Sequence, residues 1–93
     1  MTERLSNYIN GGWHPSTASE MLHVLNPASA AVLAEVPLSP AAEVDRAVEA
    51  ALKVFPAWRR TPAAERIQPL FKLKMRLEDN LDRLARTITN ECG

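Results

Sequence analysis

Few side chains in this 93-residue chain could do chemistry, and they are far apart. Cys92 could be a nucleophile, but no histidine lies near it in the sequence, and it continues an apolar helical stripe. We therefore expect a small, buried apolar side chain there. His14 and His23 could act as bases or ligands, yet with a single cysteine they do not match the spacing of a zinc site. For both histidines we expect hydrogen bonding at a strand edge.

Larger side chains offer equally weak signals. Trp13, Trp58 and Phe71 could line a pocket, but we expect them to be buried against the rest of a larger domain. Arg59 and Arg60 could bind a phosphate, although a solvated turn between helices is the favoured interpretation. The glycines, at 11, 12 and 93, form no phosphate-binding GxGxxG loop. The sequence predicts no catalytic, cofactor-binding or metal-binding residue.

Charge and composition also exclude two classes of partner. Eleven basic residues balance eleven acidic ones, so the chain lacks the positive footprint of a protein that binds nucleic acid or anionic membranes. The N-terminal residues do not match a secretory signal, and no window reaches the roughly 18 apolar residues of a membrane-spanning helix. We expect a soluble, cytoplasmic protein.

Residues 1–38 are predicted to form a β-strand region. Asn10-Gly11 is the pair that most readily forms a type I′ turn, which predicts a hairpin over residues 7–14. A second strand is predicted at 21–25, before Asn26-Pro27, and a third at 31–36, closed by Pro37.

The second half is predicted to hold two amphipathic helices, at 39–58 and 61–92. Ser39-Pro40 and Thr61-Pro62 share one start signal, a hydroxyl N-cap followed by proline at the first helical position. Pro56 should stop the first helix, and Pro69 should kink the second or delay its start. We expect an α+β fold in which residues 1–93 form a single, incomplete domain.

Three motifs follow one another along the chain: Tyr8–Trp13, Val24–Ala28 with Val32–Pro37, and Glu43–Ala51 with Phe55 and Trp58. In this order they resemble the N-terminal segment of the NAD-dependent aldehyde dehydrogenase superfamily. Two further stretches, Glu65–Lys74 and Leu84–Gly93, look most like its coenzyme-A-acylating branch, methylmalonate-semialdehyde dehydrogenase.

The resemblance implies part of the NAD-binding domain of an α/β, usually oligomeric oxidoreductase. In such an enzyme an aldehyde adds to a cysteine thiolate, hydride passes to NAD, and the thioester is released to water or coenzyme A. The family's catalytic and dinucleotide-contacting residues lie downstream of the matched stretch, so none can be assigned here. We expect this segment alone to bind no cofactor and to be inactive, with the remainder of the dehydrogenase chain or an oligomeric partner covering it.

An alternative is a free-standing α+β module that uses its amphipathic helices for binding or oligomerisation, without enzymatic activity. The two hypotheses differ in the surface that they predict. A segment of a dehydrogenase should leave an apolar patch larger than the few hundred Å² usual for monomers. A free-standing module should be compact and unfold cooperatively.

Overall fold

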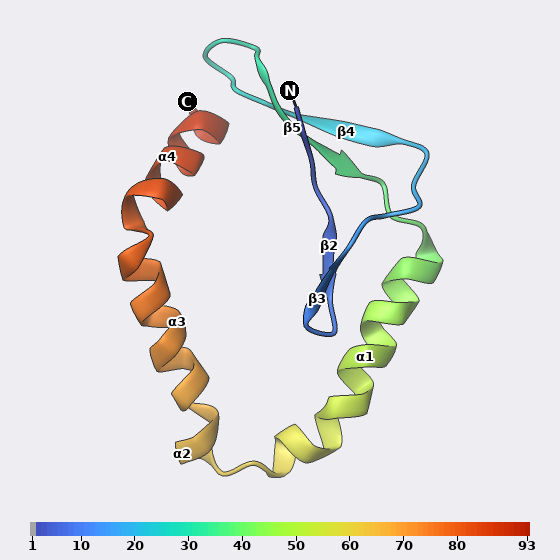
Figure 1. Cartoon of the computed structure of the whole chain (residues 1–93), viewed down its shortest axis with the longest axis vertical. Helices are drawn as coiled ribbons and strands as arrows, with labels where there is room; N and C mark the ends of the chain where they lie inside the picture. Colours follow the sequence, from blue (N-terminus) through green and yellow to red (C-terminus); the bar gives the residue numbers. More distant parts are fainter. Residues whose placement is uncertain (1) are drawn as a thin grey trace.

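The structure, a computed structural model, describes residues 2–93 and shows a small α+β arrangement. The helices and a small sheet surround an opening, into which a β-hairpin projects (Figure 1). The strands are β1 (Glu3–Arg4), β2 (Asn7–Ile9), β3 (Gly12–His14), β4 (Met21–Leu25) and β5 (Val32–Pro37). The helices are α1 (Ala41–Arg60), α2 (Ala63–Arg66), α3 (Gln68–Asp79) and α4 (Leu81–Cys92).

The hairpin predicted at residues 7–14 is confirmed as the antiparallel pair β2–β3. Asn10 and Gly11 form its turn with φ angles of 51° and 78°, the two positive values that a type I′ turn needs. Tyr8 pairs with Trp13 across the two strands, and their rings meet edge to face with centroids 5.0 Å apart. The hairpin therefore presents an aromatic pair on one face.

The predicted strands at 21–25 and 31–36 are confirmed as β4 and β5, although β5 extends to include Pro37. They pair antiparallel, with Leu22 opposite Val36 and Val24 opposite Ala34. Strand β1 was not predicted and adds to the other edge of β5 in parallel, giving the order β1-β5-β4. Two residues with a single apolar neighbour carry no period that could have revealed it.

The first helix differs from the prediction at both ends. Its N-cap is Pro40 rather than Ser39, and no side chain caps it. Pro56, expected to stop the helix, lies inside α1. Proline has a helical φ and withholds only one backbone donor, so the helix continues past it at some cost. Arg59 and Arg60, expected in a connecting turn, therefore lie in the last turn of α1.

The single helix predicted over 61–92 is wrong, because three helices occupy that range. Pro62, not Thr61, is the N-cap of α2, and α3 starts only at Gln68 with Pro69 in its first turn, as a delayed start would require. A second break falls at Asn80 (φ −111°, ψ 17°), whose side-chain amide donates to the Arg76 carbonyl over 2.8 Å. Asparagine competes with helical backbone bonding in this way.

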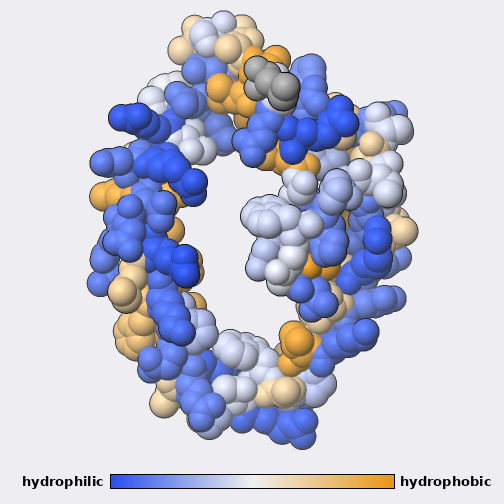
Figure 2. Space-filling model, viewed as in Figure 1, coloured by the Kyte–Doolittle hydropathy of each residue, from blue (hydrophilic) through white to orange (hydrophobic). Residues whose placement is uncertain are grey.

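The molecule is open rather than compact. Its radius of gyration is 17.0 Å, whereas a compact chain of this length has roughly 12 Å. Its accessible surface of 7944 Å² exceeds the roughly 5,400 Å² expected for a folded monomer of this mass. Among residues 2–93 no large hydrophobic side chain is buried. The apolar residues instead lie on the surface of the open framework, where Figure 2 shows them among hydrophilic residues.

The helices are too short or too polar to cross a bilayer over the residues that the structure describes. Helix α4 illustrates this, since it has only twelve residues and carries four charged side chains. Its C-terminal cap is Gly93, which has a φ of 93° and donates its amide to the Thr89 carbonyl. A positive φ at the residue that ends a helix is typical of glycine.

Candidate functional site

The most ordered polar cluster is built around Glu43, in the first turn of α1. Only Glu43 and Pro37 are buried within residues 2–93, and the Glu43 side chain is 4% exposed. Residues of the loop after β3 and of strand β2 both reach this carboxylate. A carboxylate withdrawn from water requires hydrogen-bond donors around it.

Strand β2 and the loop after β3 supply those donors. The Ser16 hydroxyl donates to Glu43 Oε2 over 2.6 Å, and Asn7 Nδ2 donates to the same oxygen over 3.2 Å. The Thr17 amide and hydroxyl both donate to Oε1, over 2.7 and 2.9 Å. Asn7 also donates to the Ser39 hydroxyl over 2.9 Å, just before the helix begins. One carboxylate thus ties β2, the loop after β3 and α1 together.

These bonds decide the ionisation of Glu43. The Ser16 hydroxyl and then the Thr17 amide lower the pKa of the carboxyl from 4.5 to about 2, outweighing the opposite effect of desolvation. The Arg46 guanidinium also lies 3.8 Å from Oε1. At neutral pH the group is ionised, and its oxygens are already occupied by donors. It is therefore a poor general base and a strong structural acceptor.

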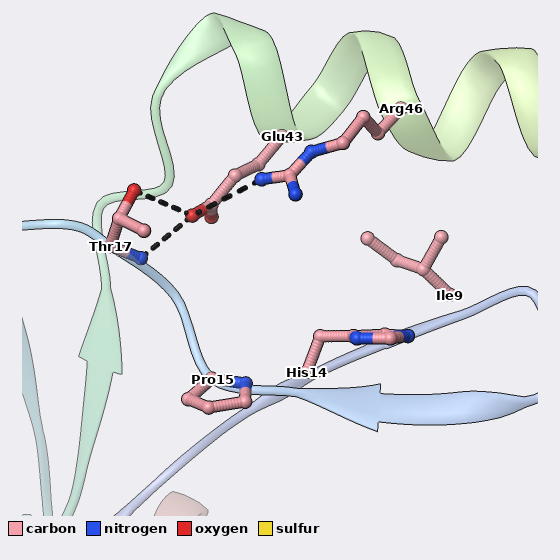
Figure 3. A pocket seen from close by; sticks show the side chains of 6 residues that line it. All are labelled: Ile9, His14, Pro15, Thr17, Glu43 and Arg46. Atoms are coloured by element: carbon pink, nitrogen blue, oxygen red, sulfur yellow. Dashed lines mark hydrogen bonds and ion pairs between the residues drawn. The ribbon is translucent and has the colours of Figure 1, made fainter.

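A shallow cavity of about 200 Å³ lies next to this cluster (Figure 3). It separates the hairpin from α1, with Ile9 and His14 on the hairpin side and Arg46 on the helix side. The complete lining is Ile9, His14, Pro15, Thr17, Glu43 and Arg46. Because Glu43 is engaged with Ser16 and Thr17, the cavity offers one exposed cation and one imidazole rather than a catalytic set.

The residues singled out for chemistry in the sequence are not brought together. Cys92 is exposed, so the prediction that it is buried is wrong for this chain. His14 borders the cavity, while His23 lies on edge strand β4 with Nε2 3.7 Å from Glu35 Oε1. Arg4 Nε reaches the same glutamate over 3.4 Å. These contacts are partly exposed and form an ordinary surface cluster.

The aromatic and arginine candidates are also dispersed. Trp13 is 72% exposed, and Trp58 and Phe71 are about half exposed, so residues 2–93 do not provide the predicted burial. Arg59 stacks over Phe55, with its guanidinium carbon 5.9 Å from the ring centroid. That contact is a cation–π pair on the surface of α1, not a phosphate site.

The potential metal ligands and the glycines are dispersed as well. No group of three metal-binding side chains occurs in the described part of the chain. Gly11 and Gly12 belong to the hairpin, and the first turn of α1 holds the ionised Glu43, whose charge would repel a phosphate. The sequence missed Glu43 as an organising residue. Its only local signal is a carboxylate in the first helical turn, a position that the helix dipole favours in any case.

Comparison with known proteins identifies the parent family. Residues 13–93 match the model of the aldehyde dehydrogenase family. The chain is 44% identical over 91 residues to malonate-semialdehyde dehydrogenase of Bacillus cereus strain B4264, and 43% identical to the enzyme of the same name from Bacillus cytotoxicus. Each alignment covers 98% of this chain and 19% of the relative.

The fold leads to the same family. A crystal structure of aldehyde dehydrogenase from Bartonella henselae superposes with a TM-score of 0.90 at 29% identity. The match covers 97% of this chain and 19% of that structure, so the chain spans about a fifth of the length of the proteins that it resembles. The resemblance inferred from the three sequence motifs is confirmed, and this chain belongs to the aldehyde dehydrogenase family.

Proposed function

We propose that this chain is the N-terminal structural segment of an NAD-dependent dehydrogenase that converts a malonate-type semialdehyde to an acyl-coenzyme A. The observation that carries the proposal is the 44% identity, over nearly the whole chain, to malonate-semialdehyde dehydrogenase. In this proposal residues 1–93 are one part of a larger domain. They supply framework, while the catalytic and dinucleotide-binding groups come from polypeptide that this chain does not contain.

The open architecture supports a framework role. Large apolar side chains on α1, α3 and α4 are about half exposed or more, including Leu52, Leu70 and Leu81. An ordinary monomer does not expose apolar surface on this scale. The remainder of a dehydrogenase polypeptide would cover these faces and close the structure. The alternative, a compact free-standing module, has no comparable observation in its favour.

The arrangement of polar groups supports it as well. Glu43 is saturated by donors from Ser16, Thr17 and Asn7, which fixes the hairpin on α1 without leaving a reactive group. Preorganised donors aimed at one carboxylate stabilise a particular backbone arrangement. We propose that this cluster sets the position of the hairpin within the assembled enzyme.

A chimera tests the function. The aligned 91 residues of the Bacillus cereus enzyme are replaced by this chain, and NADH formation is followed with malonate semialdehyde, coenzyme A and NAD. We expect acyl-coenzyme A to form at a rate comparable with that of the unmodified relative. The isolated 93-residue chain serves as a control and should neither reduce NAD nor bind it in calorimetry.

Two results would contradict the proposal in different ways. A folded chimera that oxidises other aldehydes but not malonate semialdehyde would refute the substrate class. Saturable NAD binding by the isolated chain would refute its role as framework. Cooperative unfolding of a compact, monomeric 93-residue chain would instead support the free-standing module.

A further inference from the structure

The surface of the β2–β3 hairpin is unusual in its composition. Tyr8 and Trp13 are 61% and 72% exposed, although large aromatic side chains gain most from burial. The hairpin, residues 7–14, contains no lysine, arginine, aspartate or glutamate. An uncharged surface with exposed aromatic rings is the composition that marks the centre of a protein interface.

The aromatic pair is also held rigidly. The type I′ turn fixes the two strands, and the rings of Tyr8 and Trp13 support each other edge to face. At the other end of the hairpin, Asn7 and the loop residues Ser16 and Thr17 are bonded to Glu43 of α1. A side chain that is already ordered loses little entropy when it binds. The pair is thus prepared for docking before any partner arrives.

Its direction follows from strand alternation. Ile9 and His14 face α1 across the cavity (Figure 3). Tyr8 and Trp13, one residue out of phase with them, occupy the opposite face of the hairpin. The hairpin itself lies inside the opening of the framework (Figure 1). The pair is therefore on the hairpin face opposite Ile9 and His14. Tyr8 also borders a second cavity lined by α1 residues, whereas Trp13 is the more exposed of the two rings.

We propose that Tyr8 and Trp13 form the anchor by which this segment docks onto the rest of its own dehydrogenase polypeptide, in an uncharged apolar pocket. The inference rests on the proposed function. The area to be covered calls for a large interface, and the length of the matched relatives favours this occupant over a second copy. The accessible surface exceeds that of a folded monomer by roughly 2,500 Å², the scale of an obligate interface. The matched relatives carry the corresponding segment within chains about five times as long.

Glu43 acquires a role from this proposal as a positioning residue. It does not touch the partner, but it holds both ends of the hairpin on α1 and so sets where the two rings lie. Replacing Glu43 should leave the anchor intact and misplace it. The aromatic pair would then contact the partner directly, while the carboxylate would hold the hairpin that carries the pair in position.

The experiment compares the isolated chain with the chimera described above. Hydroxyl-radical footprinting with mass spectrometry measures the oxidation rates of the Tyr8 and Trp13 side chains in both. We expect oxidation to be several-fold slower in the chimera, at all protein concentrations, because the pair becomes buried there. Equal rates in the two proteins, or a chimera that does not fold, would overturn the proposal. Protection in the isolated chain that grows with concentration would indicate a second copy and would also overturn it.

A double substitution supplies an independent measurement. Tyr8→Ser with Trp13→Ser should lower the thermal midpoint of the chimera by several degrees and leave that of the isolated chain nearly unchanged. The matched control is Asp82→Ser with Arg86→Ser, on the charged face of α4, which should have little effect in either protein. A chimera no more sensitive to the aromatic pair than to the control would contradict the anchor even if the enzyme oxidises malonate semialdehyde. Loss of stability without that activity would leave the anchor standing and refute the substrate class.

Discussion

Replacement of Gly11 by alanine tests whether backbone conformation at the hairpin turn controls the position of the aromatic pair. Gly11 has a φ of 78°, in the left-handed region that glycine adopts freely and other residues adopt at a cost. A Cβ atom at this position would have no other atom within 4 Å. The substitution therefore creates strain without a steric clash, and its whole effect comes from the backbone.

Because no steric clash contributes, the size of the effect can be taken from the backbone strain alone. A non-glycine residue in the left-handed region costs about 1–2 kcal/mol. Because β2–β3 is a local hairpin, the strain should appear as easier opening of its ladder. Exchange of the hairpin amide hydrogens, measured by NMR, should accelerate by about 5- to 30-fold at that cost. Amides in the β4–β5 pair should be unaffected, since that sheet does not include the turn.

The chain provides a matched control in the neighbouring glycine. Gly12 does not have a positive φ, and a Cβ there would lie 3.4 Å from His14 Nε2, the mobile end of a side chain. Gly12→Ala should therefore change the exchange rates much less than Gly11→Ala. Equal effects of the two substitutions would refute the reasoning. Gly11→Asn should be intermediate, because asparagine tolerates the left-handed region better than alanine does.

Four further outcomes are expected. Because the pKa of Glu43 is lowered to about 2, its contribution to hairpin docking is present above pH 4.5 and lost as the pH falls toward 2; the ring NMR signals of the hairpin should report this, and Glu43→Gln should abolish the dependence. Ser16→Ala removes the largest cause of that shift and should raise the carboxyl pKa of Glu43, as measured by ¹³C titration. Pro56→Ala restores a donor inside α1 and should stabilise that helix by up to about 3 kcal/mol, measured by amide exchange; unchanged exchange would contradict it. Asn80→Ala removes the side-chain bond to the Arg76 carbonyl and should make α3 and α4 more continuous in backbone chemical shifts, whereas a persistent break would assign the bend to other contacts.

Much of the local structure could be predicted from the sequence, because it depends on residues close together in the chain. Asn10-Gly11 specifies the hairpin turn through backbone conformation alone. The alternating apolar residues of β5 and the helical period of the second half are equally local signals. Family membership was predictable for a similar reason, because motifs and their order can be recognised in the sequence without knowing any tertiary contact.

Other features depended on a balance between the local preference of a residue and the contacts around it, which the sequence does not show. Pro56 has a helical φ and a missing donor, and only the surrounding turns decide that α1 continues through it. An asparagine such as Asn80 can cap a helix, bend it or lie within it. Here its side-chain bond to the Arg76 carbonyl coincides with the end of α3. The hydroxyls at Ser39 and Thr61 were expected to cap helices, but Ser39 bonds to Asn7 and Thr61 bonds back to the Ala57 carbonyl.

By itself, then, the sequence determined the turn, most of the strands, the helical character of the second half and the family. Only the tertiary structure decided how these elements meet. Glu43 contacts residues 26 to 36 positions away, and no local pattern encodes bonds over that separation. The same holds for the exposure of Tyr8 and Trp13, because burial is a property of what surrounds a side chain and not of its type. Glu43 in the first turn of α1 positions the hairpin only because of these long-range hydrogen bonds.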